Sequence, residues 1–339
     1  MKRYLYITTI LGLMLLLNSC LTEPSYPPIE PWLCSINADG TGFRKIKKSP
    51  FNTPGLVDIY MTKDNRIIFY GEKLWISETD SISIIPITPF DLKVHSAPGL
   101  EFTRDGGTAF FAANRDFYQL SMETFELVKI TDTPVDFRYA EPTISDDERY
   151  LTGRGYSAKS KDAQRVAYYI DLLDYSSGYI YTKFWIPSPY KTKIMTGLNK
   201  LFIVNRDGFA SVSLSDSTYT LHLPYNADWG NPFQTSADNR FILTECPQAY
   251  SRLAIAIDLN DFTRCELGTI HSNVGREPIK ACKEANTVFY FNDRHLYKYD
   301  LDTHTKSTVL GEDKIGEIYM IAPTWDGSKV HFYADIVNR

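Results

Sequence analysis

The feature of this sequence that most constrains its fold is a short polar turn that recurs seven times between apolar runs. The turns centre on Asp64, Asp105, Asp147, Asn199, Asp238, Ala285 and Asp326. Asp-Gly, Asp-Asn and related pairs between alternating apolar residues are typical of tight β-hairpins. The spacing averages about 44 residues, which is the length of a β-propeller blade.

A second series of hairpins alternates with the first. In it a strand ends at a Ser, Asn or Asp, at positions Asn37, Ser77, Ser121, Asp171, Ser213, Asp258 and Asp300. The chain begins with this second type, at residues 32–48, and finishes with the first type, at residues 318–335. We therefore predict an all-β fold, a seven-bladed β-propeller with four-stranded blades, whose last blade is closed by N- and C-terminal strands. The alternative is a β-sandwich with regular hairpins.

Several repeats resemble those of TolB-like and WD-repeat-like propellers. The hairpin at residues 37–46, NADGTGFRKI, has this character, and so do the proline-containing segments at 141–147, 231–233 and 277–279. The resemblance covers residues 32–339 and implies a seven-bladed propeller lipoprotein. Members of that family include periplasmic proteins that bind other proteins, peptidase-associated propellers and sugar-active lyases.

The N-terminus predicts export and lipidation. Lys2 and Arg3 precede an apolar run at 5–17, which is too short for a comfortable membrane span. The run ends in Leu-Asn-Ser-Cys, which resembles a bacterial lipobox with Cys20 as the lipidated residue. We predict a signal peptide at 1–19, a lipidated, proline-rich tether at 20–31 and a propeller domain at 32–339. An ordinary signal peptide or an uncleaved anchor is the alternative.

This N-terminus also predicts a location. Attachment would come from acyl chains on Cys20 rather than from a basic surface. An Asp directly after the lipidated cysteine would resemble an inner-membrane retention signal, but this position is Leu21. We therefore expect the protein to be located at the bacterial outer membrane, facing the periplasm.

Composition narrows the function classes. There are 41 acidic against 36 basic residues, a net charge of −5, which gives no sign of nucleic-acid binding. The 23 Tyr and 19 Phe favour strands.

Four further cysteines, Cys34, Cys246, Cys265 and Cys282, lie in predicted strands without zinc-ligand spacing. We favour four buried free thiols, and two disulfides are the alternative.

Three irregular loops are candidates for ligand binding, at residues 153–165, 185–195 and 224–231. Long loops on a rigid scaffold often carry function. These loops contain aromatic residues that could stack on sugars or anchor a peptide: Tyr156, Trp185, Tyr190, Tyr225 and Trp229. The alternative is that the aromatic side chains pack the loops onto the blades.

The segments that lead into the predicted innermost strands carry charges of both signs. We expect the channel entrance to collect Arg138, Tyr139, Glu141, Asn231, Arg276, Glu277 and Glu317. This composition suits a polar ligand, a peptide terminus or a buried ion. A solvated funnel with weak local ion pairs is the alternative.

The sequence contains no nucleophile elbow, zinc-protease helix or phosphate-binding glycine loop. We therefore predict no catalytic residue and no cofactor, and favour a binding or scaffolding module for a protein or glycan. The alternative is a metal-assisted polysaccharide lyase or hydrolase. In it, three histidines that fall before innermost strands would converge near the axis: His95, His222 and His271.

Overall fold

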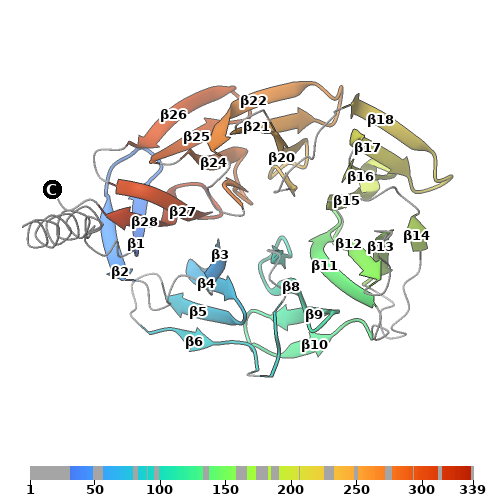
Figure 1. Cartoon of the computed structure of the whole chain (residues 1–339), viewed down its shortest axis with the longest axis horizontal. Helices are drawn as coiled ribbons and strands as arrows, with labels where there is room; N and C mark the ends of the chain where they lie inside the picture. Colours follow the sequence, from blue (N-terminus) through green and yellow to red (C-terminus); the bar gives the residue numbers. More distant parts are fainter. Residues whose placement is uncertain are drawn as a thin grey trace, which may run out of the picture.

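The computed structural model describes residues 31–48, 56–78, 83–89, 91–94, 99–132, 137–157, 166–172, 182–184, 191–205, 207–224, 233–247, 251–271, 277–292, 294–311 and 315–336. In these ranges the chain forms seven four-stranded antiparallel sheets arranged around a common axis (Figure 1). The predicted all-β propeller with four-stranded antiparallel blades is confirmed.

Six of the sheets are built from four consecutive strands, and the strands of the first five have the following bounds. They are β3 (Leu56–Met61), β4 (Arg66–Gly71), β5 (Leu74–Glu78) and β6 (Ile85–Pro86); β7 (Glu101–Phe102), β8 (Thr108–Ala113), β9 (Asp116–Ser121) and β10 (Leu127–Lys129); β11 (Phe137–Ile144), β12 (Tyr150–Ser157), β13 (Val166–Asp171) and β14 (Thr182–Phe184); β15 (Lys191–Met195), β16 (Lys200–Asn205), β17 (Gly208–Ser213) and β18 (Tyr219–Pro224); β19 (Gln234–Thr235), β20 (Phe241–Pro247), β21 (Ser251–Asp258) and β22 (Arg264–His271).

A sixth sheet contains β23 (Ile279–Ala281), β24 (Thr287–Asn292), β25 (His295–Asp300) and β26 (Thr305–Leu310). The last sheet combines the two ends of the described chain, in the order β2 (Arg44–Lys48), β1 (Pro31–Asn37), β28 (Lys329–Ile336) and β27 (Ile315–Pro323). We call it the closing sheet. In it β1 and β28 pair in continuous antiparallel register from Pro31 opposite Asp335 to Asn37 opposite Lys329. The predicted closure by terminal strands is confirmed.

Several turns between the first and second strands contain the same side-chain hydrogen bonds. In Thr62, Ser236 and Thr324 the hydroxyl donates to the Asp two residues later, at 2.5, 2.6 and 2.6 Å. The same hydroxyl accepts the N–H of the residue that starts or precedes the next strand, for example from Arg66 at 2.8 Å. In these turns the side chain therefore adds hydrogen bonds to those of the backbone.

The core consists of apolar layers between neighbouring sheets. Its largest fully buried side chains are aromatic, among them Tyr70, Phe111, Phe202, Tyr290 and Tyr333. The four cysteines described here are all free, and three of them are buried while Cys265 is half-buried. The preference for free thiols is thus confirmed, although one thiol is less buried than expected. No helix in the described part of the chain is long and apolar enough to cross a membrane.

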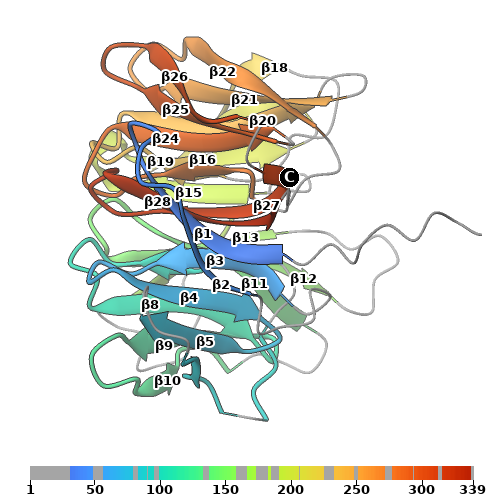
Figure 2. The ribbon, with the colours of Figure 1, turned by 90° about the vertical axis from the view of Figure 1, so that its left-hand side faces the viewer.

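Strand direction gives the ring of sheets two different faces. The hairpin turns described above lie on one, which we call the back face, and the first strand of each sheet begins at the other, the front face. Because β1 begins and β28 ends at the front face, both ends of the described chain lie there (Figure 2).

Candidate functional site

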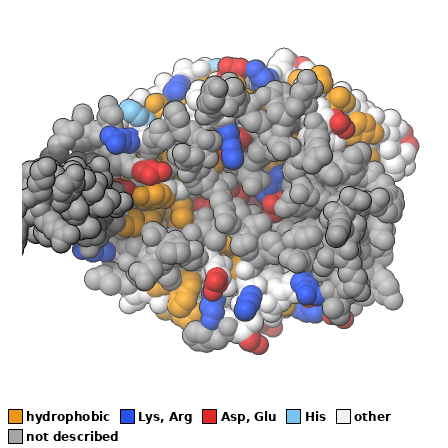
Figure 3. Space-filling model, viewed as in Figure 1, with side chains coloured by type: hydrophobic (Ala, Val, Ile, Leu, Met, Phe, Trp, Pro, Cys, Tyr) orange, Lys and Arg blue, Asp and Glu red, His pale blue; other side chains and the backbone are white. Residues whose placement is uncertain are grey.

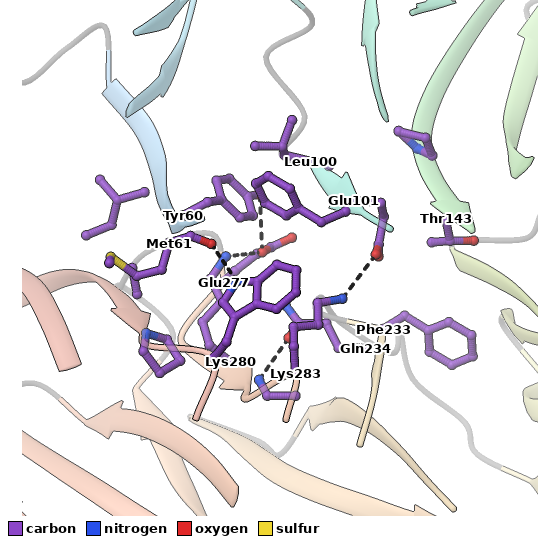
Figure 4. A pocket seen from close by; sticks show the side chains of 18 of the residues that line it. Tyr60, Met61, Leu100, Glu101, Thr143, Phe233, Gln234, Glu277, Lys280 and Lys283 are labelled. Atoms are coloured by element: carbon purple, nitrogen blue, oxygen red, sulfur yellow. Dashed lines mark hydrogen bonds and ion pairs between the residues drawn. The ribbon is translucent and has the colours of Figure 1, made fainter. Parts of the chain in front are cut away.

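A cavity of about 80 Å³ lies on the axis of the propeller, and we call it the axial pocket. The first strand of every sheet contributes to its wall (Figure 4). The seven contributions include Tyr60 from β3, Glu101 from β7, Thr143 from β11, Lys191 from β15, Gln234 from β19, Lys280 from β23 and Ala322 from β27. Such convergence follows from the fold, because only first strands reach the axis.

The wall of the pocket contains a buried lysine between two carboxylates. Lys280 Nζ lies 2.6 Å from Asp58 Oδ2 and 2.5 Å from Glu277 Oε2, and all three side chains are buried. The same ammonium lies 4.0 Å from the centroid of the Tyr60 ring, whose hydroxyl is 3.5 Å from Glu277 Oε2. We call Asp58, Glu277 and Lys280 the axial triad.

The axial triad has an unequal distribution of charge. Burial raises the pKa of Asp58 to about 7, against the opposing effect of Lys280. Burial also acts to raise the pKa of Glu277, but Lys280 and Lys191 together hold it below its ordinary value. The two carboxylates keep the pKa of Lys280 raised despite its burial. Near neutral pH the triad is therefore best described as a lysine ammonium, a Glu277 carboxylate and an Asp58 carboxyl group that retains much of its proton.

More buried charges surround the triad near the front face. Lys191 Nζ lies 3.7 Å from Glu141 Oε2, and both side chains are buried. Glu245, on the second strand of its sheet, is fully buried and accepts from Arg252 at 2.9 Å. Burial raises the pKa of Glu245 to about 7. Its second oxygen, Oε1, has no hydrogen-bond partner among the described residues.

Two lysines and one carboxylate lie further along the axis. Lys283 Nζ is 3.5 Å from Glu101 Oε2. Lys193, on β15 and two residues beyond Lys191, is buried, and burial lowers its pKa. Along the axis, acidic side chains therefore predominate near the front face and basic side chains predominate toward the back face.

The pocket is closed toward the back face by aromatic side chains. Trp325, which follows β27, packs edge-on against Phe102 with ring centroids 6.0 Å apart. Its indole N–H donates to the carbonyl of Met61 at 2.9 Å, and the side chain is buried. The front face is different, because charged side chains of both signs are visible near its centre (Figure 3).

The structure describes only some of the candidate site residues that were predicted from the sequence. It brings Glu141 and Glu277 together with the axial lysines, as expected for a channel entrance. Glu317 lies on β27 with its side chain exposed. The backbone of Arg138 and Tyr139 lies on the innermost strand β11, and that of Tyr156 on β12, but their side chains are outside the described residues. Other candidates are entirely outside the described residues: Trp185, Tyr190, Tyr225, Trp229, Asn231, Arg276 and Cys20.

The irregular segments are also shorter than predicted. Strand β12 continues to Ser157, and β15 begins at Lys191, so the first part of the predicted loop 153–165 and the last part of the predicted loop 185–195 are regular strand. The stretch from 153 to 157 pairs with β11 and β13 rather than forming a loop.

Sequence reasoning missed most of the axial pocket. Asp58, Tyr60, Lys191, Lys193 and Lys280 carry its chemistry, and none was a candidate. A signal was present, since lysines alternate with other residues at 191–193, in a segment predicted as a loop, and recur at 280 and 283, after the predicted entry into an innermost strand at 277–279. A lysine in a strand that must be buried requires a partner, which is a reason to examine it.

The expected position of His222 near the axis is wrong. His222 lies on β18, the outermost strand of its sheet, where it shares a 2.8 Å hydrogen bond with Ser211. Its ring stacks on Phe262 of the next sheet with centroids 3.7 Å apart. His271 ends β22, another outermost strand, with its side chain outside the described residues, and His95 lies outside them altogether. Among the described residues, no group of three His, Cys, Asp or Glu is arranged to hold a metal.

Comparison with known proteins supports the fold. No family model matches the sequence, and no curated protein does. Among solved structures, an oligogalacturonate lyase in complex with manganese is similar, with TM-score 0.60, 9% identity and coverage of 84% of this chain and 90% of that one. An oligogalacturonate lyase from Vibrio parahaemolyticus is similar with TM-score 0.57 and 10% identity, over 93% of this chain and 95% of that one. A putative TolB from Agrobacterium tumefaciens is similar with TM-score 0.51 and 12% identity, over 91% of this chain and 99% of that one. At these identities the likeness concerns the fold alone.

Proposed function

We propose that this chain is an outer-membrane lipoprotein, anchored through Cys20 and facing the periplasm, whose seven sheets form one seven-bladed propeller that binds a protein or glycan of the cell envelope. The observation that supports this most is the axial pocket. Side chains from all seven sheets line it, and it is closed at the back by Trp325. A concave site with a few converging polar groups is the usual form of a ligand site.

The ligand would approach from the front face. There the buried pairs of Lys191 with Glu141 and of Lys280 with Glu277 present both charges within a confined space. Within each pair the lysine and the carboxylate neutralise one another. The site therefore favours a ligand that offers hydrogen bonds, such as a peptide terminus or a sugar, over a simple ion. Arg138, Asn231 and Arg276 would add polar contacts at the rim.

Aromatic side chains around this face would supply most of the affinity. We assign this role to Tyr156, Trp185, Tyr190, Tyr225 and Trp229. Tyrosine and tryptophan contribute large contact areas at low entropic cost, which makes them frequent anchors in protein and glycan recognition.

The anchor would orient this face. Pro31 begins β1 at the front face, so the tether from Cys20 joins the propeller on the side that would bind ligand. Eleven residues extend at most about 40 Å. The front face would thus stay close to the membrane, and its partner would lie in that interval.

Capture from envelope extracts tests the binding function. The purified propeller is expected to retain one partner or glycan that the Trp185→Ala/Trp229→Ala variant loses. Tyr219→Ala is the matched control, because Tyr219 is an exposed aromatic residue on the outermost strand β18. Equal capture by wild type and the double variant would refute the assignment of these aromatic residues.

Fractionation tests the anchor separately. Wild-type protein is expected in the membrane fraction and labelled by a fatty-acid analogue, whereas Cys20→Ser should be unlabelled and released. Membrane retention of unlabelled Cys20→Ser would contradict lipidation.

The metal-assisted lyase is the second candidate. It retains support from the fold it shares with oligogalacturonate lyases, but the position of His222 removes one of its three proposed ligands from the axis. Stoichiometric metal in the purified protein, together with turnover of a glycan that His95→Ala/His271→Ala abolishes, would favour the lyase over the binding module.

A further inference from the structure

The axial triad joins two sheets that are not neighbours in the chain. Asp58 lies on β3, whereas Glu277 and Lys280 lie at and on β23, so the contact between Lys280 and Asp58 spans 222 residues. The sheets that contain β3 and β23 lie on either side of the closing sheet, whose first strand β27 contacts both. The triad therefore bridges the closing sheet, in which pairing of the two terminal strands completes the propeller.

The arrangement contains the parts needed for an amide bond. Lys280 Nζ is 2.6 Å from Asp58 Oδ2, and a second carboxylate, that of Glu277, lies 2.5 Å from the same nitrogen. All three side chains are 7% exposed or less. We propose that Lys280 and Asp58 react to form an intramolecular isopeptide bond, with Glu277 carrying the protons.

The reaction balances without any co-reactant. It starts from the Lys280 ammonium, the Glu277 carboxylate and the protonated Asp58 carboxyl group. Glu277 Oε2 takes one proton from Nζ, and the free amine attacks Asp58 Cγ, forming the Nζ–Cγ bond. Glu277 then passes a proton to the departing hydroxyl and receives the second proton from Nζ. The Cγ–O bond breaks, one water leaves, and Glu277 ends protonated beside a neutral amide.

The surroundings favour each step. Burial keeps a proton on Asp58 near neutral pH, so that its hydroxyl can leave as water. The raised pKa of Lys280 opposes loss of its proton, and this is why an acceptor in direct contact is required. The fold holds nitrogen and carboxyl together, which replaces an encounter in solution by an effective molarity of up to about 10⁸ M. The axial pocket beside the triad receives the water.

The bond gives the propeller a covalent closure. Without it, the closing sheet is held by noncovalent contacts alone. These are main-chain pairing, principally between β1 and β28, side-chain packing, and side-chain hydrogen bonds such as that from Trp325 to Met61. With it, the two sheets flanking the closing sheet are tied together at the axis, and the unfolded chain contains a large closed loop, which lowers its entropy. This inference is independent of the lipid anchor. It changes the ligand site, because the bond leaves Lys280 as an amide and Glu277 protonated, so that the pair of Lys191 with Glu141 presents the charges there.

Mass spectrometry of the full chain tests the proposal. A tryptic digest of wild type is expected to contain the peptide of Lys280 joined to that of Asp58, lighter than their sum by one water. Lys280→Met should release both peptides unlinked. Asp58→Asn should give the same cross-link with loss of ammonia in place of water, which no mere ion pair explains.

A second set of variants isolates the role of Glu277. Glu277→Gln keeps the shape but cannot accept the proton, so Lys280 should remain unmodified in that variant. Lys298→Met, on β25 of the same sheet, is the control and should keep the cross-link. Boiled in SDS, wild type should migrate faster than Lys280→Met because of its closed loop. Recovery of the unlinked Lys280 and Asp58 peptides alone from aged wild-type protein would overturn the proposal, whatever the variants do.

Discussion

The indole N–H of Trp325 donates to the carbonyl of Met61 at 2.9 Å, between residues 264 positions apart. Trp325 follows β27 in the closing sheet, and Met61 ends β3 in the next sheet. The contact therefore ties the last part of the chain to an early strand and at the same time closes the back of the axial pocket.

Replacement of Trp325 should weaken the propeller strongly. Trp325→Ala removes a buried indole, and we expect the free energy of unfolding to fall by about 3–5 kcal/mol. Trp325→Phe keeps much of the apolar volume and loses the hydrogen bond, so about 1 kcal/mol is expected. Urea unfolding followed by tryptophan-independent circular dichroism measures both. If the two variants lost equal amounts of unfolding free energy, the larger part of the contribution of Trp325 could not be assigned to packing of its ring.

Gly106 lies against the same tryptophan and tests the backbone of a back-face turn. It has φ +76°, and an added Cβ would lie 2.7 Å from Lys63 Cβ and 3.2 Å from the Trp325 ring. Gly106→Ala should lower the free energy of unfolding by about 1–3 kcal/mol. The neighbouring Gly107→Ala is the control, since its Cβ would approach only the Asp105 side chain, at 3.4 Å. Similar stability of the two variants in urea would argue against strain at Gly106.

The fold could be predicted because its signals are local and repeated. Residues such as Asp64 and Asp326 define turns within a few positions, and their regular spacing indicates blades without any knowledge of long-range contacts. The closure by β1 and β28 followed from the order of hairpin types. Even the side-chain hydrogen bond from Thr62 to Asp64 has a sequence signature, a hydroxyl residue two positions before the Asp of the turn.

The axial site could be predicted only in part. Glu141 and Glu277 were found because they precede innermost strands. Lys191 and Lys193 were missed because residues 185–195 were predicted as an irregular loop, and loops lie at the surface. In the structure both lysines lie on an innermost strand and are buried near the axis, and only the assembled ring of sheets shows that Lys280 meets Asp58.

His222 should behave as a packing residue. Its ring stacks on Phe262 and shares a hydrogen bond with Ser211, and burial, assisted by Lys200, lowers its pKa. We expect His222→Ala to lower the free energy of unfolding by about 1–3 kcal/mol and to leave the metal content of purified protein unchanged. Elemental analysis of wild type and variant after incubation with manganese measures the second effect. Loss of bound metal in the variant would restore His222 as a ligand.

Glu245 should make the stability of the propeller depend on pH. Burial raises its pKa in the folded protein from 4.5 to about 7, so the folded state binds a proton more tightly than the unfolded chain. The stabilisation is therefore complete below about pH 4.5 and is lost as the pH rises through 7. Glu245→Gln remains neutral throughout. The free energy of unfolding of wild type minus that of Glu245→Gln should fall by about 3 kcal/mol between pH 4.5 and 8.

Urea unfolding at intervals over this pH range isolates the contribution of Glu245, because every other titrating group is common to both proteins. Glu266→Gln is the matched control for the loss of one carboxylate, because Glu266 is exposed on the outermost strand β22, where it pairs with Arg264 at 2.6 Å. A wild-type protein that gains stability relative to Glu245→Gln as the pH rises would mean that the ion pair with Arg252 outweighs burial. The carboxylate at Glu245 would then be the favoured form in the folded protein, contrary to the expectation from its unpartnered Oε1.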